Sequence, residues 1–238
     1  MNTDFLSVEE NGGIVTLTMN RPPANALDLE ATVAATEVVR QFHTDIPKAL
    51  ILTGLGDFFS GGLDLKAIPQ YSQTQQKETV LALSDLVEKL YSFPAPTVAA
   101  INGHAVAAGT LLALCTDHRI AADTDIKFGL TGTKVGIPYP SSAQAVIQAE
   151  LAPPVVRRML LGAEVFGLSE AVRVGIVDEI QPADGLLEAA EAEAKRLAEF
   201  PSATYRAVKR ELRSEALSKI RKAIEGNDPF LESWLAQS

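Results

Sequence analysis

The chain has 238 residues, of which 47% are hydrophobic and 21% charged, and its formal net charge at pH 7 is −9. This length suffices for a sizeable core, and the composition is typical of a globular protein. The acidic balance, with no cluster of lysine or arginine, argues against a nucleic-acid partner. One cysteine excludes an intramolecular disulfide, and no cysteine–histidine spacing indicates a metal site. No apolar run reaches membrane-spanning length and the N-terminus lacks a basic, apolar leader, so we expect a cytoplasmic protein with no membrane partner.

The N-terminal part predicts strands around one helix. Phe5 to Glu9 and Ile14 to Met19 alternate well enough to form the two strands of a hairpin. Asp28 is a typical N-cap residue and predicts a helix that ends near Phe42. Lys48 to Thr53 then predicts a buried strand.

Two loops of small residues each follow a predicted strand and lead into a helix. The first is Ser60-Gly61-Gly62, and the second runs from Ala105 to Gly109, after the strand Thr97 to Ile101 and before an apolar helix. Side chains this small let another group approach the backbone closely. The first N–H groups of a helix have no partner within it and lie at the positive end of its dipole. Each loop can therefore offer one N–H to a single oxygen, as in an oxyanion hole, although close packing of helix on sheet also explains such residues.

The rest of the chain is predicted to be mainly helical. Ile68 to Lys77 is polar and predicts an irregular loop, and a helix is expected from about Glu78 to Tyr91. Further predicted elements are a strand at His118–Ala122, helices at about 143–150, 154–161 and 168–174, and an extended segment at 176–180. Residues 183–200 and 202–224 predict helices separated by Pro201.

Several segments together resemble those of a known family. Phe58–Lys66 (FFSGGLDLK) and Ala100–Asp117 resemble the two signature segments of the crotonase (enoyl-CoA hydratase/isomerase) superfamily, and are most similar to Δ3,Δ2-enoyl-CoA isomerases. The similarity continues through Gly129–Gly136 and Leu168–Ile180. It implies an α/β fold, a crotonase-type spiral of ββα units, with an acyl-CoA-binding core at 1–182. It also implies a helical oligomerisation tail at 183–238, which forms homotrimers or hexamers and here lacks the last helix of the family.

The resemblance implies an acyl-CoA thioester as substrate, with coenzyme A arriving as part of it, no permanently bound cofactor and no metal. The backbone N–H groups of Leu63 and Ala108 correspond to the oxyanion hole that stabilises the enolate. The substrate-binding positions carried over are Ala24, Ala26, Gly62, Leu63, Asp64, Leu65, Lys66, Ala107, Ala108, Thr131 and Gly132. In this family the loop around Arg21 lies near the adenosine of coenzyme A. Arg21 and Lys66 are therefore possible phosphate contacts, with solvent-exposed side chains as the simpler interpretation.

The two glutamates that move protons in the hydratases of this family correspond here to Leu111 and Gly132, neither of which can carry a proton. Three alternatives follow. Another residue acts as acid or base, with Tyr139 as the speculative choice and Ser141, Ser142 and His104 as others. A bound anion replaces the carboxylate, as the resemblance of Thr131–Gly136 to naphthoate synthases suggests. In the third, the protein binds acyl-CoA without converting it.

Overall fold

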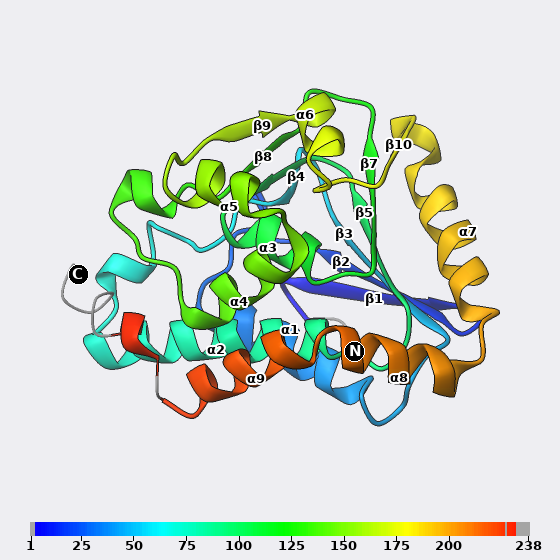
Figure 1. Cartoon of the computed structure of the whole chain (residues 1–238), viewed down its shortest axis with the longest axis horizontal. Helices are drawn as coiled ribbons and strands as arrows, with labels where there is room; N and C mark the ends of the chain where they lie inside the picture. The colour runs from blue at the N-terminus through cyan, green and yellow to red at the C-terminus, as the bar shows by residue number, and fades with distance from the viewer. Residues whose placement is uncertain (1–2, 227, 232–238) are drawn as a thin grey trace.

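The computed structural model describes residues 3–226 and 228–231, which form two sheets surrounded by helices (Figure 1). The larger sheet has the strand order β1-β2-β3-β5-β7-β10, and only β1 runs antiparallel to its neighbour. Its strands are β1 (Leu6–Asn11), β2 (Ile14–Met19), β3 (Ala49–Gly54), β5 (Thr97–Ile101), β7 (His118–Ala122) and β10 (Glu179–Gln181). The hairpin and the central strands thus confirm the prediction. β3 and β5 are buried along their whole length, as is usual in a parallel sheet with both faces covered.

The smaller sheet has the order β4-β6-β8-β9, with β9 antiparallel to β8. Its strands are β4 (Phe58–Ser60), β6 (His104–Val106), β8 (Lys127–Gly129) and β9 (Val165–Gly167). Each has only three residues, and none of the four was predicted as a strand. The smaller sheet is what places the two small-residue loops side by side, because β4 precedes the first loop and β6 enters the second.

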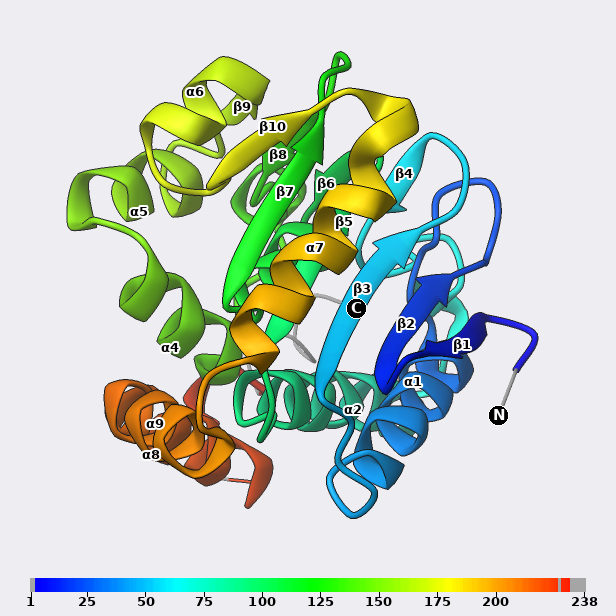
Figure 2. The ribbon, with the colours of Figure 1, turned by 90° about the vertical axis from the view of Figure 1, so that its right-hand side faces the viewer.

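Helices cover both faces of the larger sheet. The α-helices of the described residues are α1 (Leu29–Gln41), α2 (Gln73–Tyr91), α3 (Ala108–Leu114), α4 (Ser141–Glu150), α5 (Pro153–Leu160), α6 (Leu168–Arg173), α7 (Leu186–Ala198), α8 (Ser202–Leu212) and α9 (Ser214–Ile224). Short 3-10 turns occur at η1 (Ile68–Gln70), η2 (Gly132–Val135) and η3 (Ala183–Gly185). Figure 2 shows α7 lying across β7, β5 and β3 on one face. On the other face, α1, α2 and α3 contribute Val39, Leu86 and Leu112 to the packing against Leu17 and Leu52.

The helix α2 begins earlier than predicted. Residues 68–77 were expected to be irregular, but Ser72 caps α2, and the helix starts at Gln73. The Ser72 hydroxyl accepts a hydrogen bond from the Gln75 N–H, and the Gln75 side chain accepts one from the Ser72 N–H. This capping box stabilises a first turn that its polar composition alone did not suggest. The expectation of an irregular loop over 68–77 was therefore wrong for residues 73–77.

The C-terminal helices pack onto the core at two places. α7 lies on the larger sheet, whereas α9 packs against α2 and α4. The expected break at Pro201 is present, and a second break at Arg213 separates α8 from α9. The oligomerisation role of residues 183–238 stays a prediction, and the expected lack of a last family helix concerns residues beyond 231, outside those described. In the described part, no helix is long and apolar enough to cross a membrane, and the cytoplasmic location stays a prediction.

Candidate functional site

The two small-residue loops touch each other through Gly62. A Cβ atom on Gly62 would lie 2.7 Å from the Ala108 nitrogen and 2.7 Å from the Ala107 Cβ, and Gly62 has φ +84°. Only glycine satisfies both the backbone conformation and the contact. A Cβ on Gly109 would likewise clash with the Ser60 carbonyl oxygen, so both loops need a glycine where they cross.

The backbone N–H groups of Leu63 and Ala108 are unbonded in the described part of the chain. Neither group donates a hydrogen bond to any of residues 3–226 and 228–231. The neighbouring N–H groups of Gly62, Asp64 and Ala107 each donate one. Ala107 has φ +51° and ψ −120°, a strained conformation for a residue with a side chain, and directly precedes α3. The Ala107 N–H donates to the Gly129 carbonyl at 2.6 Å, which fixes the start of the helix on β8.

A third loop locks the first one in place. Gly61 N–H donates to the Ala24 carbonyl at 2.7 Å, and Leu27 N–H donates to the Gly62 carbonyl at 2.7 Å. The Asn25 side chain donates to the Phe58 carbonyl at 2.7 Å, and the Ser60 hydroxyl donates to the Asn25 carbonyl at 2.8 Å. Ser60 and Asn25 thus hold Gly62 in position. Sequence reasoning missed both, because their effect depends on contacts between separate loops.

The Arg21 side chain forms ion pairs with carboxylates of this chain. Its guanidinium bonds Asp28 at 2.7 Å and Asp64 at 2.9 Å, and donates to the Ala26 carbonyl. Burial alone would raise the pKa of Asp64, but hydrogen bonds from Arg21 and from the N–H groups of Ala67 and Lys66 hold this pKa below its usual value. The ion pairs tie the first and third loops together. The Arg21 side chain is therefore engaged, whereas Lys66 is exposed.

A cavity of about 110 Å³ opens beside the two free N–H groups. Of the predicted site residues, it brings together Leu63, Leu65, Ala107, Ala108, Thr131, Gly132 and Tyr139. Leu111 also lines it, with apolar residues of α2, α4 and the segment after η2. Ala24, Ala26, Gly62, Asp64 and Lys66 lie outside this lining but within the bonded loops. The cavity can thus receive an apolar group next to the two N–H donors.

Among the described residues that line this cavity, Tyr139 is the one with a titratable side chain. Its hydroxyl donates to the Leu130 carbonyl at 2.6 Å. A Cβ on Gly132 would lie 2.9 Å from the Tyr139 Cζ and 3.1 Å from its hydroxyl oxygen, so the phenol occupies the space of a side chain at 132. Burial raises the pKa of Tyr139, and the N–H groups of Thr133 and Gly132 oppose this by stabilising the phenolate.

The other residues considered as acid or base lie elsewhere. The His104 ring packs edge-on against Phe58, and its Nδ1 accepts a hydrogen bond from the Lys127 N–H. The Ser142 hydroxyl is buried against that of Ser84 at 2.8 Å, and the Ser141 hydroxyl donates to Asp228 at 2.9 Å. None of the three lines the cavity. Within the described residues, no group of histidine, cysteine and carboxylate side chains is arranged to bind a metal ion.

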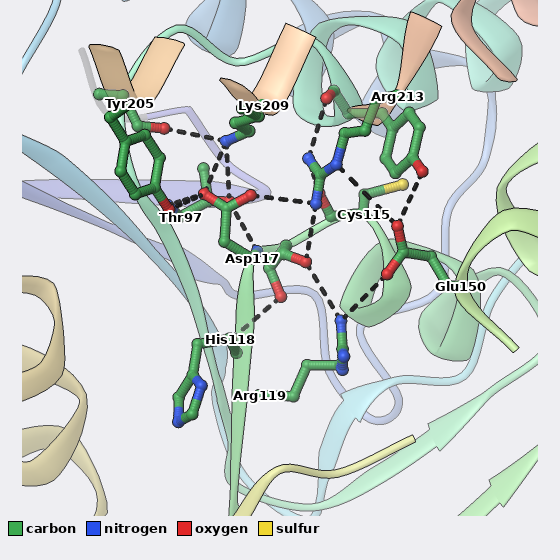
Figure 3. Close-up of polar contacts among 12 residues, drawn as sticks. Thr97, Cys115, Asp117, His118, Arg119, Glu150, Tyr205, Lys209 and Arg213 are labelled. Atoms are coloured by element: carbon green, nitrogen blue, oxygen red, sulfur yellow. Dashed lines mark hydrogen bonds and ion pairs between the residues drawn. The ribbon is translucent and has the colours of Figure 1, made fainter. Parts of the chain in front are cut away.

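A second group of perturbed side chains is structural (Figure 3). Asp117 accepts hydrogen bonds from Lys209 at 2.7 Å and Tyr205 at 2.9 Å, and pairs with Arg213 at 3.0 Å. Burial works to raise the pKa of Asp117, but Lys209 and Arg213 outweigh it and keep this pKa low. Arg213 also donates to the Tyr91 carbonyl at 2.9 Å. Because these groups satisfy one another, the cluster anchors α8 to the core.

Comparison with known proteins supports this description. The enoyl-CoA hydratase/isomerase family matches residues 9–238. The chain is 31% identical over 215 residues to a probable enoyl-CoA hydratase of Mycobacterium avium, covering 87% of this chain and 82% of that protein. It is 30% identical over 223 residues to a carnitinyl-CoA dehydratase of Escherichia coli, covering 93% and 85%. The crystal structure of a probable enoyl-CoA hydratase from Mycobacterium tuberculosis superposes with a TM-score of 0.88 at 29% identity, covering 94% of each chain.

The two sheets, the spiral of short units and the crossed loops define a protein of the crotonase superfamily. Within that superfamily, the chain belongs to the enoyl-CoA hydratase/isomerase family. The predicted fold class is thereby confirmed.

Proposed function

We propose that the protein binds an acyl-CoA thioester and stabilises its enolate through the N–H groups of Leu63 and Ala108. The observation that carries this proposal is the pair of unbonded N–H groups at a glycine crossing, beside an apolar cavity. Two N–H donors that point at one oxygen stabilise the negative charge that develops on a thioester carbonyl. The acyl chain lies in the cavity, against Leu111 and its apolar neighbours.

Tyr139 is the proposed proton-transfer group. Its phenol fills the position of a side chain at 132, next to Gly132, and no other described residue in the lining of the cavity titrates. Burial raises the pKa of Tyr139 and so favours the neutral phenol, while the N–H groups of Thr133 and Gly132 partly offset this and assist formation of the phenolate that accepts a proton. This assignment makes the protein an acyl-CoA enzyme of the hydratase/isomerase type with an unusual acid/base residue.

The two alternatives differ in their support. A bound anion in place of a carboxylate at 132 is disfavoured, because the Tyr139 ring already occupies that space. An acyl-CoA binder without turnover is favoured by the Tyr139 hydroxyl, which already donates to Leu130. Proton exchange separates this binder from an enzyme.

The experiment follows deuterium uptake at C2 of butyryl-CoA in heavy water by mass spectrometry. We expect uptake above the protein-free rate, and a decrease of about a hundredfold or more in Tyr139→Phe. Tyr71→Phe is the matched control, because Tyr71 lies outside the cavity lining and its hydroxyl bonds no described residue. Binding without uptake would establish the binder, and equal uptake in both variants would remove Tyr139 from the mechanism.

We also propose that α8 mediates self-association into a trimer or hexamer. Its outer face carries Val208 and Leu212, which are 62% and 82% exposed, next to Phe200. Exposed apolar groups that lie together on a surface indicate an interface. Leu212→Glu should shift the mass measured by light scattering from the oligomer to the monomer, and an unchanged mass would exclude this face.

A further inference from the structure

A second cavity, of about 350 Å³, lies between the C-terminal end of α2 and the helices α8 and α9. We call it the basic hollow. Its lining includes the charged side chains Lys89, Arg206, Arg210 and Arg221 against one carboxylate, Glu88, in a chain of net charge −9. Lys209 also contributes, although its ammonium bonds Asp117 and so points toward the core. The basic hollow shares no lining residue with the acyl cavity.

The positive charges of the basic hollow exceed what its own carboxylate can neutralise. Glu88 accepts hydrogen bonds from Lys89 at 2.9 Å and Arg221 at 3.0 Å, so it is shared between two cations. Arg206 makes one contact, from its Nε to the Pro94 carbonyl at 3.3 Å. The Arg210 guanidinium has no hydrogen bond or ion pair with any described residue. Like charges that line one cavity repel one another, and an anion among them would relieve this repulsion.

His43 lines the basic hollow, and its pKa responds to the charges around it. Its Nε2 lies 2.8 Å from the Lys89 carbonyl oxygen. Because a carbonyl can only accept, Nε2 carries the proton and donates this hydrogen bond, and Nδ1 is the atom that titrates. Burial lowers the pKa of His43, the Lys89 carbonyl opposes this, and the charges of Lys89 and Lys209 lower it further. Glu88 is the carboxylate that acts in the opposite direction.

We propose that the basic hollow is a binding site for a small phosphorylated anion, held by the guanidinium groups of Arg206 and Arg210. A guanidinium presents paired N–H donors that match two oxygens of a phosphate group. The volume lies within the range of small-molecule sites, and the exposed positions of both arginines give the anion a path of entry. This site is additional to the proposed acyl-CoA site.

Pyrophosphate titration at constant ionic strength tests the proposal. The chain has three histidines, so the pKa of each imidazole can be followed by NMR with His104 as the internal reference. We expect saturable binding, and a rise in the pKa of His43 that His104 does not show. The double variant R206Q/R210Q should weaken binding about tenfold or more. Lys222→Gln, a neighbouring exposed position on α9 outside the lining, should bind as the wild type does.

Three outcomes would overturn the proposal. If the pKa of His43 rises with pyrophosphate concentration without saturating, the rise comes from general screening of charge and not from a binding site. Equal shifts in the pKa of His43 and His104 would place the anion elsewhere. Unchanged affinity in R206Q/R210Q, or an equal loss in Lys222→Gln, would show that these arginines do not form the site. Circular dichroism of each variant confirms that it folds, which is expected because both arginines are exposed.

Discussion

Replacing Gly62 by alanine tests whether the crossing of the two loops forms the oxyanion hole. The new Cβ would lie 2.7 Å from the Ala108 nitrogen, whereas ordinary contacts between such atoms begin near 3.4 Å. The loops must therefore separate by about 0.7 Å or more, which displaces one or both N–H groups. A misplacement of about 1 Å lowers a catalysed rate about a hundredfold. We expect the C2 exchange rate of butyryl-CoA to fall by this factor.

The matched control is Gly175→Ala. Gly175 has φ +80°, close to the +84° of Gly62, but a Cβ there meets no atom within 4 Å. Both variants pay the conformational strain of alanine at positive φ, about 1 to 2 kcal/mol of unfolding free energy. Only Gly62→Ala should lose more than this in denaturant unfolding, and only Gly62→Ala should lose exchange. Equal losses of stability with exchange retained in both variants would refute the reasoning.

Two further changes probe the scaffold. Asp117→Asn leaves Lys209 without its anion and should cost about 3 to 5 kcal/mol of unfolding free energy in denaturant titrations near pH 7. Since the pKa of Asp117 is lowered in the folded state, its stabilisation is complete well above pH 3.8 and is lost as the pH falls through the lowered value, so the variant should show a weaker acid dependence. Ser141 lies in the first turn of α4, and its N–H donates to the Asp228 carboxylate at 3.0 Å. Asp228→Ala removes this acceptor and should lower the free energy of unfolding by about 1 kcal/mol and the Tm by about 2 to 4 °C.

Each of these changes has an opposite outcome that counts against the account. If Asp117→Asn unfolds at the wild-type denaturant concentration, the cluster of Figure 3 does not anchor α8. An acid dependence identical in the two proteins would show that Asp117 titrates normally in the folded state. An unchanged Tm in Asp228→Ala would mean that the contact with Ser141 does not cap α4.

Much of the larger sheet was predictable because β3 and β5 are apolar along their length and β2 alternates apolar residues with threonine. Ile14 to Met19 and Thr97 to Ile101 read as strands from their residues alone, and both form. The smaller sheet could not be predicted, because its strands β4, β6, β8 and β9 have three residues each and contain glycine, alanine or serine. Their pairing depends on neighbours far away in the sequence, which no local pattern records.

The same distinction holds at the site. The small residues of the two loops were a local signal for close backbone approach, and the resemblance to the crotonase superfamily then singled out the Leu63 and Ala108 N–H groups. The contact of Tyr139 with Gly132 was not predictable, since it follows from the path of the chain after η2. The role of Arg21 was also hidden, because Asp28 and Asp64 meet it only in the folded chain.

The most direct test of the account measures the thioester carbonyl itself. Butyryl-CoA labelled with ¹³C at the carbonyl is bound to the protein, and its C=O stretch is read by isotope-edited infrared spectroscopy. Hydrogen bonds from Leu63 and Ala108 weaken that bond, so we predict a band at lower frequency than in water, and its partial return in Gly62→Ala. A bound ligand whose band stays at the aqueous position would contradict the proposed oxyanion hole.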